Sequence, residues 1–372
     1  MEVVSASPKS LSRRSAFALA LGGLALPMRS RSAPPQAIQQ AIQIIQKQIE
    51  SGMLHAAAFR VQRGDQVTEQ AFGKAQIDSM FLLGSITKPL TAVAIMVLVD
   101  RGELRLSDPA VKYLPEFRAE ARPAITIEQL LTHTSGLPDQ LPNNNDLRAH
   151  HAPLSEFVKG AMRTPLLFPP GTQYHYQSMG ILLAAEIVER VTKTSLPSFL
   201  QEHVFKPFNM SHTVLGLGQF RKVDMVPMQT EHAAPESGGG DVNAREWDWN
   251  SDYWRNLAAP WGGGHSTVGD MTIFLRSFLR PDGKVLREET ARLMIVDHTP
   301  TLEAHRGIGF MVGPTGFGSA CSAQTFGHSG STGTLAWADP QTDTSFVLLT
   351  ALPKNVSGNL ILRPTADLVS GA

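Results

Sequence analysis

The sequence predicts a mixed α/β fold of the α+β type, in which helices flank an antiparallel sheet formed by the N- and C-terminal segments and a helical subdomain is inserted between them. Extended runs around a Gly-Asp turn (55–73) and around an Asp-Pro turn (325–353) predict strands near both ends of the chain. Helical periodicity dominates the residues between them. This order of elements favours one sheet assembled from both ends.

Length and composition limit the classes of protein to which this chain can belong. The chain has 372 residues, enough for one large domain at 35–372 with its helical subdomain at about 105–265. The formal net charge is zero, so the sequence lacks the excess positive charge that is typical of nucleic-acid-binding proteins. The single cysteine, Cys321, excludes an internal disulfide and a cysteine-rich zinc site. No His-Glu-x-x-His motif occurs, so we expect neither a metal nor a cofactor.

Residues 1–34 have the composition of a targeting segment. Arg13 and Arg14 precede an apolar run from Ala16 to Pro27, which is too short for a membrane span and suits a signal-peptide core. The paired arginines indicate twin-arginine export to the periplasm or the exterior. An organelle transit peptide is the alternative, because the segment is rich in Arg and Ser and nearly free of acidic residues.

The remaining elements are recognised by periodicity, capping residues and turn residues. The short helix near residue 126, for example, has Thr126 and Gln129 in capping-box spacing. In chain order we expect an amphipathic helix at 33–52, a hairpin at 55–73, an apolar helix from Ser85 to Gly102, a capped helix at 125–138, a loop with one short helix at 138–171, a helix at 178–195, a capped helix at 266–279 and two strands at 325–353.

An irregular stretch between residues 214 and 262 contains four of the five tryptophans: Trp247, Trp249, Trp254 and Trp261. Aromatic side chains in such an insert form either the wall of a substrate cleft or a satellite core under a long loop. The sequence favours neither interpretation over the other.

The segment "FLLGSITKPLTA" carries the main chemical signal. Ser85 and Lys88 lie three residues apart, so on a helix they share a face. A helix-capping serine followed by a solvated lysine is the simpler interpretation of an isolated Ser-x-x-Lys. The apolar neighbours and the positive helix end both lower a lysine pKa, however, and a neutral amine can take the serine proton.

Two further segments offer partners for this pair. Tyr176 precedes a strong helix, where it is either a proton shuttle or an aromatic residue at the edge of the core. His328 lies in "GHSGSTG", where the glycines either admit a substrate backbone or form a hairpin corner.

Taken in order, these segments resemble the serine β-lactamase and penicillin-binding superfamily. They are most similar to its branch of class C β-lactamases, D-aminopeptidases, D-alanyl-D-alanine carboxypeptidases and related esterases. The resemblance covers roughly residues 36–352. It rests on "FLLGSITK", "LRLSDPAVKYLPEF", "ITIEQLLTHTSGLP", "FPPGTQYHYQSMGILLAAEIVERVT", "FLQEHVFKPFNMSHT", "WGGGHSTVGDMTIFLRSFL" and "GHSGSTGT".

The resemblance implies a role for each matching residue. Ser85 is the expected acylated nucleophile, and Lys88 and Tyr176 are expected to share the proton transfers. The backbone N–H groups of Ser85 and Ser331 are expected to form the oxyanion hole. His328 and Gly330 are expected to line the substrate edge, where an extended acyl substrate pairs with the strand.

Two positions depart from the family pattern. Ser178 stands where the family's Tyr-x-Asn motif has asparagine, and a serine hydroxyl is shorter than the amide and lacks its separate donor and acceptor. His328 stands where many members have the lysine of Lys-Thr-Gly, so a carboxylate-bearing substrate is expected to lose a charge partner. Ser178 is a candidate substrate-binding residue in its own right.

The sequence therefore predicts a serine hydrolase that acts through an acyl-enzyme on a carboxylic ester or a small D-amino-acid peptide or amide, with weak β-lactam hydrolysis as a side activity. A class C-like β-lactamase or a D-alanyl-D-alanine carboxypeptidase is the alternative within the same class. A non-catalytic penicillin-binding or assembly protein on the same scaffold is the alternative from another class. The expected partners are small molecules, with no nucleic acid and no stable membrane span beyond the N-terminal segment.

Overall fold

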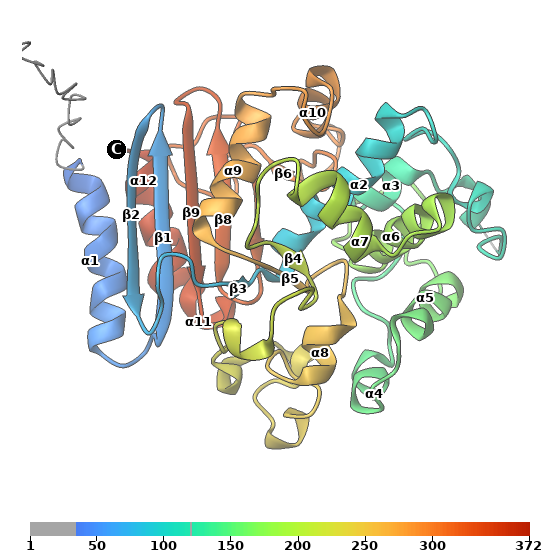
Figure 1. Ribbon diagram of the computed structural model, residues 1–372. Coiled ribbons are helices and arrows are strands. Elements are labelled where there is room, and N and C mark those ends of the chain that lie inside the picture. Colours follow the sequence, from blue (N-terminus) through green and yellow to red (C-terminus); the bar gives the residue numbers. More distant parts are fainter. Residues whose placement is uncertain (1–34, 120) are drawn as a thin grey trace, which may run out of the picture. The chain divides into compact units, whose positions relative to one another are not determined.

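A computed structural model describes residues 35–119 and 121–372, which belong to one compact unit (Figure 1). The targeting segment expected at residues 1–34 lies outside the described residues. Within the described ranges, every helix is too short or too polar to cross a membrane.

The principal sheet has six antiparallel strands in the order β2-β1-β9-β8-β7-β6. The N-terminal hairpin joins the C-terminal strands through β1 and β9, where Ala57 pairs with Thr350 and Arg63 with Thr344. The predicted sheet from both ends of the chain is therefore confirmed. Its strands are β1 (Ala56–Arg63), β2 (Gln66–Gly73), β6 (Met311–Val312), β7 (Phe326–Gly330), β8 (Thr334–Asp339) and β9 (Thr344–Thr350).

The sequence predicted two strands at 325–353, whereas the structure has three, so this prediction was wrong. The Asp-Pro turn joins β8 to β9 as expected, but β7 precedes them and is connected to β8 by a short turn. Gly333 in this turn has a φ of 84°, a conformation that L side chains rarely adopt. A Cβ atom there would lie 1.8 Å from the Leu352 carbonyl oxygen, so only glycine fits this reversal.

Each face of the sheet buries its own apolar cluster, as alternation along the strands requires. Phe59, Trp337 and Phe346 pack under α1 (Gln36–Glu50) and α12 (Arg363–Ser370). Figure 1 shows these two helices beside the sheet and α9 (Val268–Leu279) on its opposite side. The neighbouring strand residues, including Ala58, Ala336 and Val347, join the larger cluster that extends into the helical region.

The helical region is built around α2 (Thr87–Asp100). Apolar residues face all sides of α2, and twelve of its residues are buried, as expected for a helix inside a core. The capping box of Thr126 and Gln129 forms as predicted. Residues 138–171 contain two helices where one was predicted. The bounds of the helical subdomain, about 105–265, stay a prediction. The helices are α3 (Ile127–Leu131), α4 (Asn144–Ala149), α5 (Leu154–Arg163), α6 (Met179–Thr192), α7 (Leu196–Leu200), α8 (Asp252–Leu257), α10 (Glu288–Met294) and α11 (Lys354–Ser357).

A small second sheet lies between the large sheet and these helices. Its strands β3 (Phe81–Leu82), β5 (Gly264–Ser266) and β4 (Val214–Leu215) are paired in the order β3-β5-β4. Because β3 ends at Leu82, shortly before Ser85, its pairing with β5 fixes the position of the segment that carries the predicted nucleophile.

Candidate active site

Ser85 lies in a single 3₁₀ turn, Gly84–Ile86, that leads directly into α2. The turn begins at Gly84, whose φ is 57°. A Cβ atom on Gly84 would lie 2.7 Å from the Thr332 hydroxyl, so glycine lets this turn approach the end of β7. The Thr87 hydroxyl then closes the turn with a 2.7 Å hydrogen bond to the Gly84 carbonyl.

Lys88 lies in the first turn of α2, and its Nζ is 3.1 Å from Ser85 Oγ. The lysine side chain is fully buried, and its second hydrogen bond, also 3.1 Å, goes to the Trp261 carbonyl. Desolvation lowers the pKa of Lys88 to about 8, while the negative charge of Asp139 acts in the opposite direction. The apolar surroundings therefore lower the lysine pKa, as the sequence predicts.

Tyr176 approaches the same pair from the loop before α6. The centroid of its ring lies 4.7 Å from Lys88 Nζ. Burial raises the pKa of Tyr176, and its hydrogen bond with Ser85 opposes this shift. The Tyr176 phenol is therefore protonated at neutral pH. Of Tyr176 and Lys88, it is Lys88 whose pKa, about 8, lies closer to neutrality.

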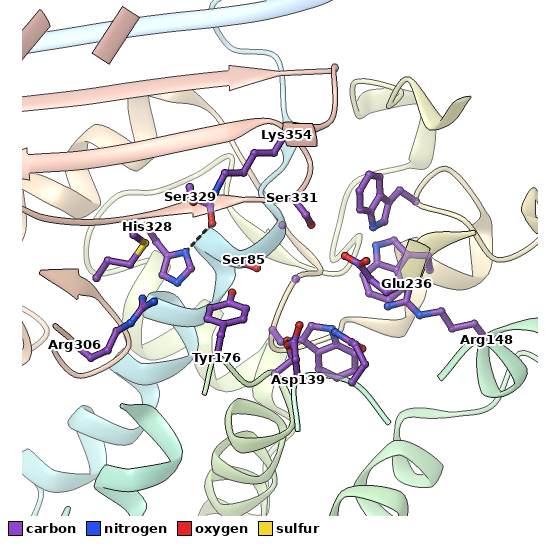
Figure 2. A pocket seen from close by; sticks show the side chains of 18 of the residues that line it. Ser85, Asp139, Arg148, Tyr176, Glu236, Arg306, His328, Ser329, Ser331 and Lys354 are labelled. Carbon is purple, nitrogen blue, oxygen red and sulfur yellow. Dashed lines mark hydrogen bonds between the residues drawn. The ribbon is translucent and has the colours of Figure 1, made fainter. Parts of the chain in front are cut away.

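An open cavity of about 390 Å³ lies in front of Ser85 (Figure 2). It brings together residues from distant parts of the sequence, because the turn that carries Ser85, the loop before α6 and the end of β7 meet there. Of the predicted site residues, Ser85, Tyr176, Ser178, His328 and Ser331 line this cavity.

Two predicted residues of the β7 edge have different surroundings. Ser331 follows β7 directly, and its backbone nitrogen lies 3.3 Å from the position that a Gly84 Cβ would occupy. Gly330 is not among the residues that line the cavity. A Cβ atom on Gly330 would lie 2.2 Å from the Leu83 carbonyl oxygen, so this glycine lets β7 pack against the chain before Ser85. Its substrate-binding role stays a prediction.

His328 is buried in β7, with Nδ1 2.7 Å from the Ser329 carbonyl oxygen. Because a carbonyl only accepts, Nδ1 carries the proton and Nε2 is left as an acceptor. Nε2 has no hydrogen-bond partner among the described residues. Desolvation, followed by the charges of Arg306 and Lys88, holds the pKa of His328 well below its usual range, so the ring is neutral.

Ser178 is held by an acidic neighbour. Its hydroxyl donates a 2.6 Å hydrogen bond to Asp139 Oδ1, and its backbone N–H donates to the Asp139 carbonyl. Asp139 also lines the cavity. The Ser178 hydroxyl proton is therefore already engaged, so the hydroxyl has only acceptor capacity left.

Five charged residues of the cavity wall were missed by sequence analysis: Asp139, Arg148, Glu236, Arg306 and Lys354. They lie in irregular segments, in a single 3₁₀ turn or in very short helices, where no periodicity singles them out. His328 is neutral, so it offers a carboxylate no charge partner, and the loss of that partner stays a prediction for the substrate. Arg306 and Lys354 are cations that line the same cavity.

Three of the four tryptophans line a cavity, as the first interpretation predicts, and they are buried in the main core and not in a satellite core. Trp249, Trp254 and Trp261 are at most 4% exposed and belong to the main core, and they also line the cavity. Trp247 is only partly buried and does not line it. Among the described residues, no group of three or more His, Cys, Asp or Glu side chains is arranged to hold a metal ion.

A Ser-x-x-Lys turn at the edge of an antiparallel sheet, with a tyrosine across a shared cavity, is the arrangement that the sequence resemblance implies. The family model described as Beta-lactamase matches residues 41–369, and the chain belongs to this family.

Individual relatives are more distant. Protein flp of Staphylococcus aureus (strain MW2) is 26% identical over 228 residues, 58% of this chain and 45% of that protein, so the chain spans less than half of its length. The solved structure of "EstCE1, a hydrolase with promiscuous acyltransferase activity" is 22% identical and has a TM-score of 0.73, covering 90% of this chain and 99% of that one. A D-stereospecific amidohydrolase from Streptomyces sp. is 23% identical with a TM-score of 0.68, covering 87% and 96%. At these identities the two structural likenesses show the fold alone.

Proposed function

We propose that the protein is a serine hydrolase that forms an acyl-enzyme on Ser85 and acts on a carboxylic ester or a small D-amino-acid peptide or amide. The observation that carries the proposal is the contact between Ser85 Oγ and a fully buried lysine amine whose pKa is about 8. A neutral amine at 3.1 Å from a hydroxyl is within reach of its proton.

In the proposed reaction Ser85 Oγ attacks the substrate carbonyl carbon while its proton passes to Lys88. The bond from that carbon to the leaving oxygen or nitrogen then breaks, and the leaving group takes a proton from Tyr176, which is restored from Lys88. Water attacks the acyl-enzyme by the same steps in reverse order, releasing the carboxylic acid and free Ser85. The N–H groups of Ser85 and Ser331 are proposed to bind the oxyanion.

One feature of the site favours an ester or D-amino-acid substrate over an efficient β-lactamase: Ser178 supplies a hydroxyl, already bound to Asp139, in place of an amide. Solved structures of the same fold include a hydrolase with promiscuous acyltransferase activity and a D-stereospecific amidohydrolase as well as β-lactamases, so all three substrate classes need to be assayed. Side-by-side assays of p-nitrophenyl esters, D-Ala-D-Ala peptides and nitrocefin will rank these substrates against the β-lactamase and carboxypeptidase alternatives. Rapid nitrocefin turnover by the pure protein would reverse the order.

Covalent labelling tests whether the protein is an enzyme at all. A fluorophosphonate is expected to add one phosphonyl group to Ser85, because only an activated hydroxyl reacts at neutral pH. Mass spectrometry of the intact protein and of its peptides locates the adduct, and Ser85→Ala is the matched control that takes up none. A folded wild-type protein without an adduct on Ser85 would favour the non-catalytic binding protein.

The acylation rate is expected to depend on pH through Lys88. The base form is the neutral amine, and burial lowers the pKa to about 8, so the active fraction rises as pH increases. With a neutral ester, kcat/KM should increase about tenfold per pH unit from pH 6 to 7 and level off above pH 8. Initial rates corrected for spontaneous hydrolysis check this. A profile that is flat from pH 6 to 9 would exclude Lys88 as the base.

A further inference from the structure

His133 is a buried histidine that the reaction proposed above does not use. It begins the His-Thr-Ser-Gly segment after α3, is 1% exposed and is not among the residues that line the cavity. Its φ is 63°, in the left-handed region that residues other than glycine rarely adopt. Such a conformation persists where the surrounding contacts impose it, and it is frequent at functional sites. The contacts of His133 therefore indicate what it does.

His133 holds the backbone on both sides of Tyr176. Its carbonyl oxygen accepts a 3.0 Å hydrogen bond from the His175 N–H, and its ring nitrogen Nδ1 accepts a 3.1 Å hydrogen bond from the Gln177 N–H. Both neighbours of Tyr176 in the sequence are thus bound to one residue. Because peptide groups are planar, fixing the two that flank Tyr176 also fixes the direction in which its side chain leaves the backbone.

The imidazole of His133 also packs against the Tyr176 ring. The two ring centroids are 4.7 Å apart, and the ring planes meet at 37°. The Tyr176 hydroxyl hydrogen-bonds with Ser85, and Figure 2 shows the phenol directed toward that serine. A side chain locked by packing and by its backbone contacts holds its polar atom in one place. His133 therefore helps to keep the phenol hydroxyl beside Ser85.

The acceptor role of Nδ1 requires a neutral ring, because a protonated imidazole has two donors and no acceptor. Desolvation, followed by the charges of Arg306 and Lys88, holds the pKa of His133 well below its usual range. The ring is therefore neutral, and Nδ1 accepts from the Gln177 N–H without competition from a proton.

The residues after His133 hold other parts of the loop before α6. The Thr134 carbonyl accepts a 2.7 Å hydrogen bond from the Gly171 N–H. The Ser135 hydroxyl donates a 2.7 Å hydrogen bond to the side-chain oxygen of Gln177. The loop is thus anchored at several points along the His-Thr-Ser-Gly segment, and the bonds of His133 are those that flank the proposed proton donor.

We propose that His133 is a positioning residue, whose carbonyl and Nδ1 hold the backbone on both sides of Tyr176 so that the phenol hydroxyl reaches the leaving group. This inference rests on the proposed function, in which Tyr176 protonates the leaving group. It assigns to His133 a task that matters only for the steps in which this proton is transferred.

The test compares two kinds of leaving group. An alkoxide needs a proton when it departs, whereas p-nitrophenolate departs without one. His133→Leu removes the acceptor, and we expect the ratio of kcat/KM for an alkyl ester to that for a p-nitrophenyl ester to fall about 10- to 100-fold, as for a group displaced by about 1 Å. His133→Asn has a side chain of similar shape with an acceptor, Oδ1, and tolerates a positive φ, so it should keep the ratio within about threefold of the wild-type value.

Two further variants guard against a merely structural effect. His133→Gly adopts a φ of 63° without strain and still lacks the acceptor, so it should lower the ratio as His133→Leu does. His151→Leu is the matched control, because His151 also has a positive φ, 50°, and stacks on Tyr253, but neither residue lines the cavity. It should leave the ratio unchanged. Equal losses on both esters in folded His133→Gly, or an asparagine variant as impaired as the leucine variant, would overturn the proposal.

A double variant tests whether His133 acts through Tyr176. Tyr176→Phe has no hydroxyl to position, so adding His133→Gly to it should lower the ratio by less than about threefold further. If the two losses multiplied instead, His133 would act independently of the tyrosine, and the positioning role would be refuted.

Crystal structures of the variants measure the placement of Tyr176 without catalysis, so they separate this proposal from the proposed function. In His133→Leu and His133→Gly we expect the Tyr176 hydroxyl to lie about 1 Å or more from its wild-type position, whereas His133→Asn should keep it in place. That outcome would support the positioning role even if Ser85 takes up no phosphonate. A hydroxyl that stays in place in every variant, with normal phosphonate labelling of Ser85, would support the hydrolase and refute the positioning role.

Discussion

Replacing Lys88 by alanine is expected to slow acylation of Ser85 by about 10²- to 10⁴-fold, the range for loss of a positioned general base. The amine is the group within 3.1 Å of Ser85 Oγ that is partly neutral near pH 8, whereas Tyr176 is fully protonated there. The rate of fluorophosphonate labelling, followed by intact mass, measures this step without any assumption about the natural substrate.

The melting temperature of the Lys88→Ala variant is expected to differ little from that of the wild type. Alanine leaves a cavity and an unpaired Trp261 carbonyl, but it also removes a buried amine whose desolvation opposes folding. Lys88→Met fills the space without a base and should label as slowly, with a melting temperature close to that of the wild type. If labelling of either folded variant fell by less than tenfold, Tyr176 alone would be the base.

Removing the Tyr176 hydroxyl is expected to have the second large effect. Tyr176→Phe keeps the ring beneath Lys88 and removes the proton donor, so hydrolysis of alkyl esters and amides should fall about 10²- to 10⁴-fold. A p-nitrophenyl ester should be affected much less, because p-nitrophenolate departs without protonation. The ratio of kcat/KM for an alkyl ester to that for the p-nitrophenyl ester reports this difference.

Tyr174→Phe is the matched control for the tyrosine prediction. Tyr174 lies in the same loop, and its hydroxyl accepts from Arg306 instead of contacting Ser85. We expect this variant to leave the ratio between the two esters within about threefold of the wild-type value. Equal losses on both esters in Tyr176→Phe would show that the hydroxyl orders the site and does not protonate the leaving group.

Much of the fold was predictable because its signals are local. The capping box at Thr126, the isoleucine stripe of α1 and the strand alternation on both sides of the Gly-Asp turn each depend on residues a few positions apart. The third C-terminal strand was not predicted, because the sequence left open whether the glycines before Thr334 form a hairpin corner. The structure shows that Gly333 lies in the turn between β7 and β8, where its contact with the Leu352 carbonyl excludes a side chain.

In the candidate site, too, local sequence signals predicted some residues and not others. Ser85 and Lys88 are three residues apart at the start of α2, so local helix geometry alone brings their side chains together. Arg306 and Asp139 belong to irregular segments and Glu236 to a single 3₁₀ turn, so no periodicity and no spacing along the chain predicts that they line one cavity.

By itself, the sequence determined that Ser85 and Lys88 lie side by side and that the sheet is made from both ends of the chain, because hydrophobic periodicity and helix geometry act over a few residues. The tertiary structure decided which charged groups line the cavity in front of Ser85. His328 is neutral because burial and the nearby Arg306 and Lys88 disfavour its charged form, and Arg306 reaches the cavity because the loop before β6 packs against Tyr176. Such long-range electrostatics depend on distances in space, which no local pattern encodes.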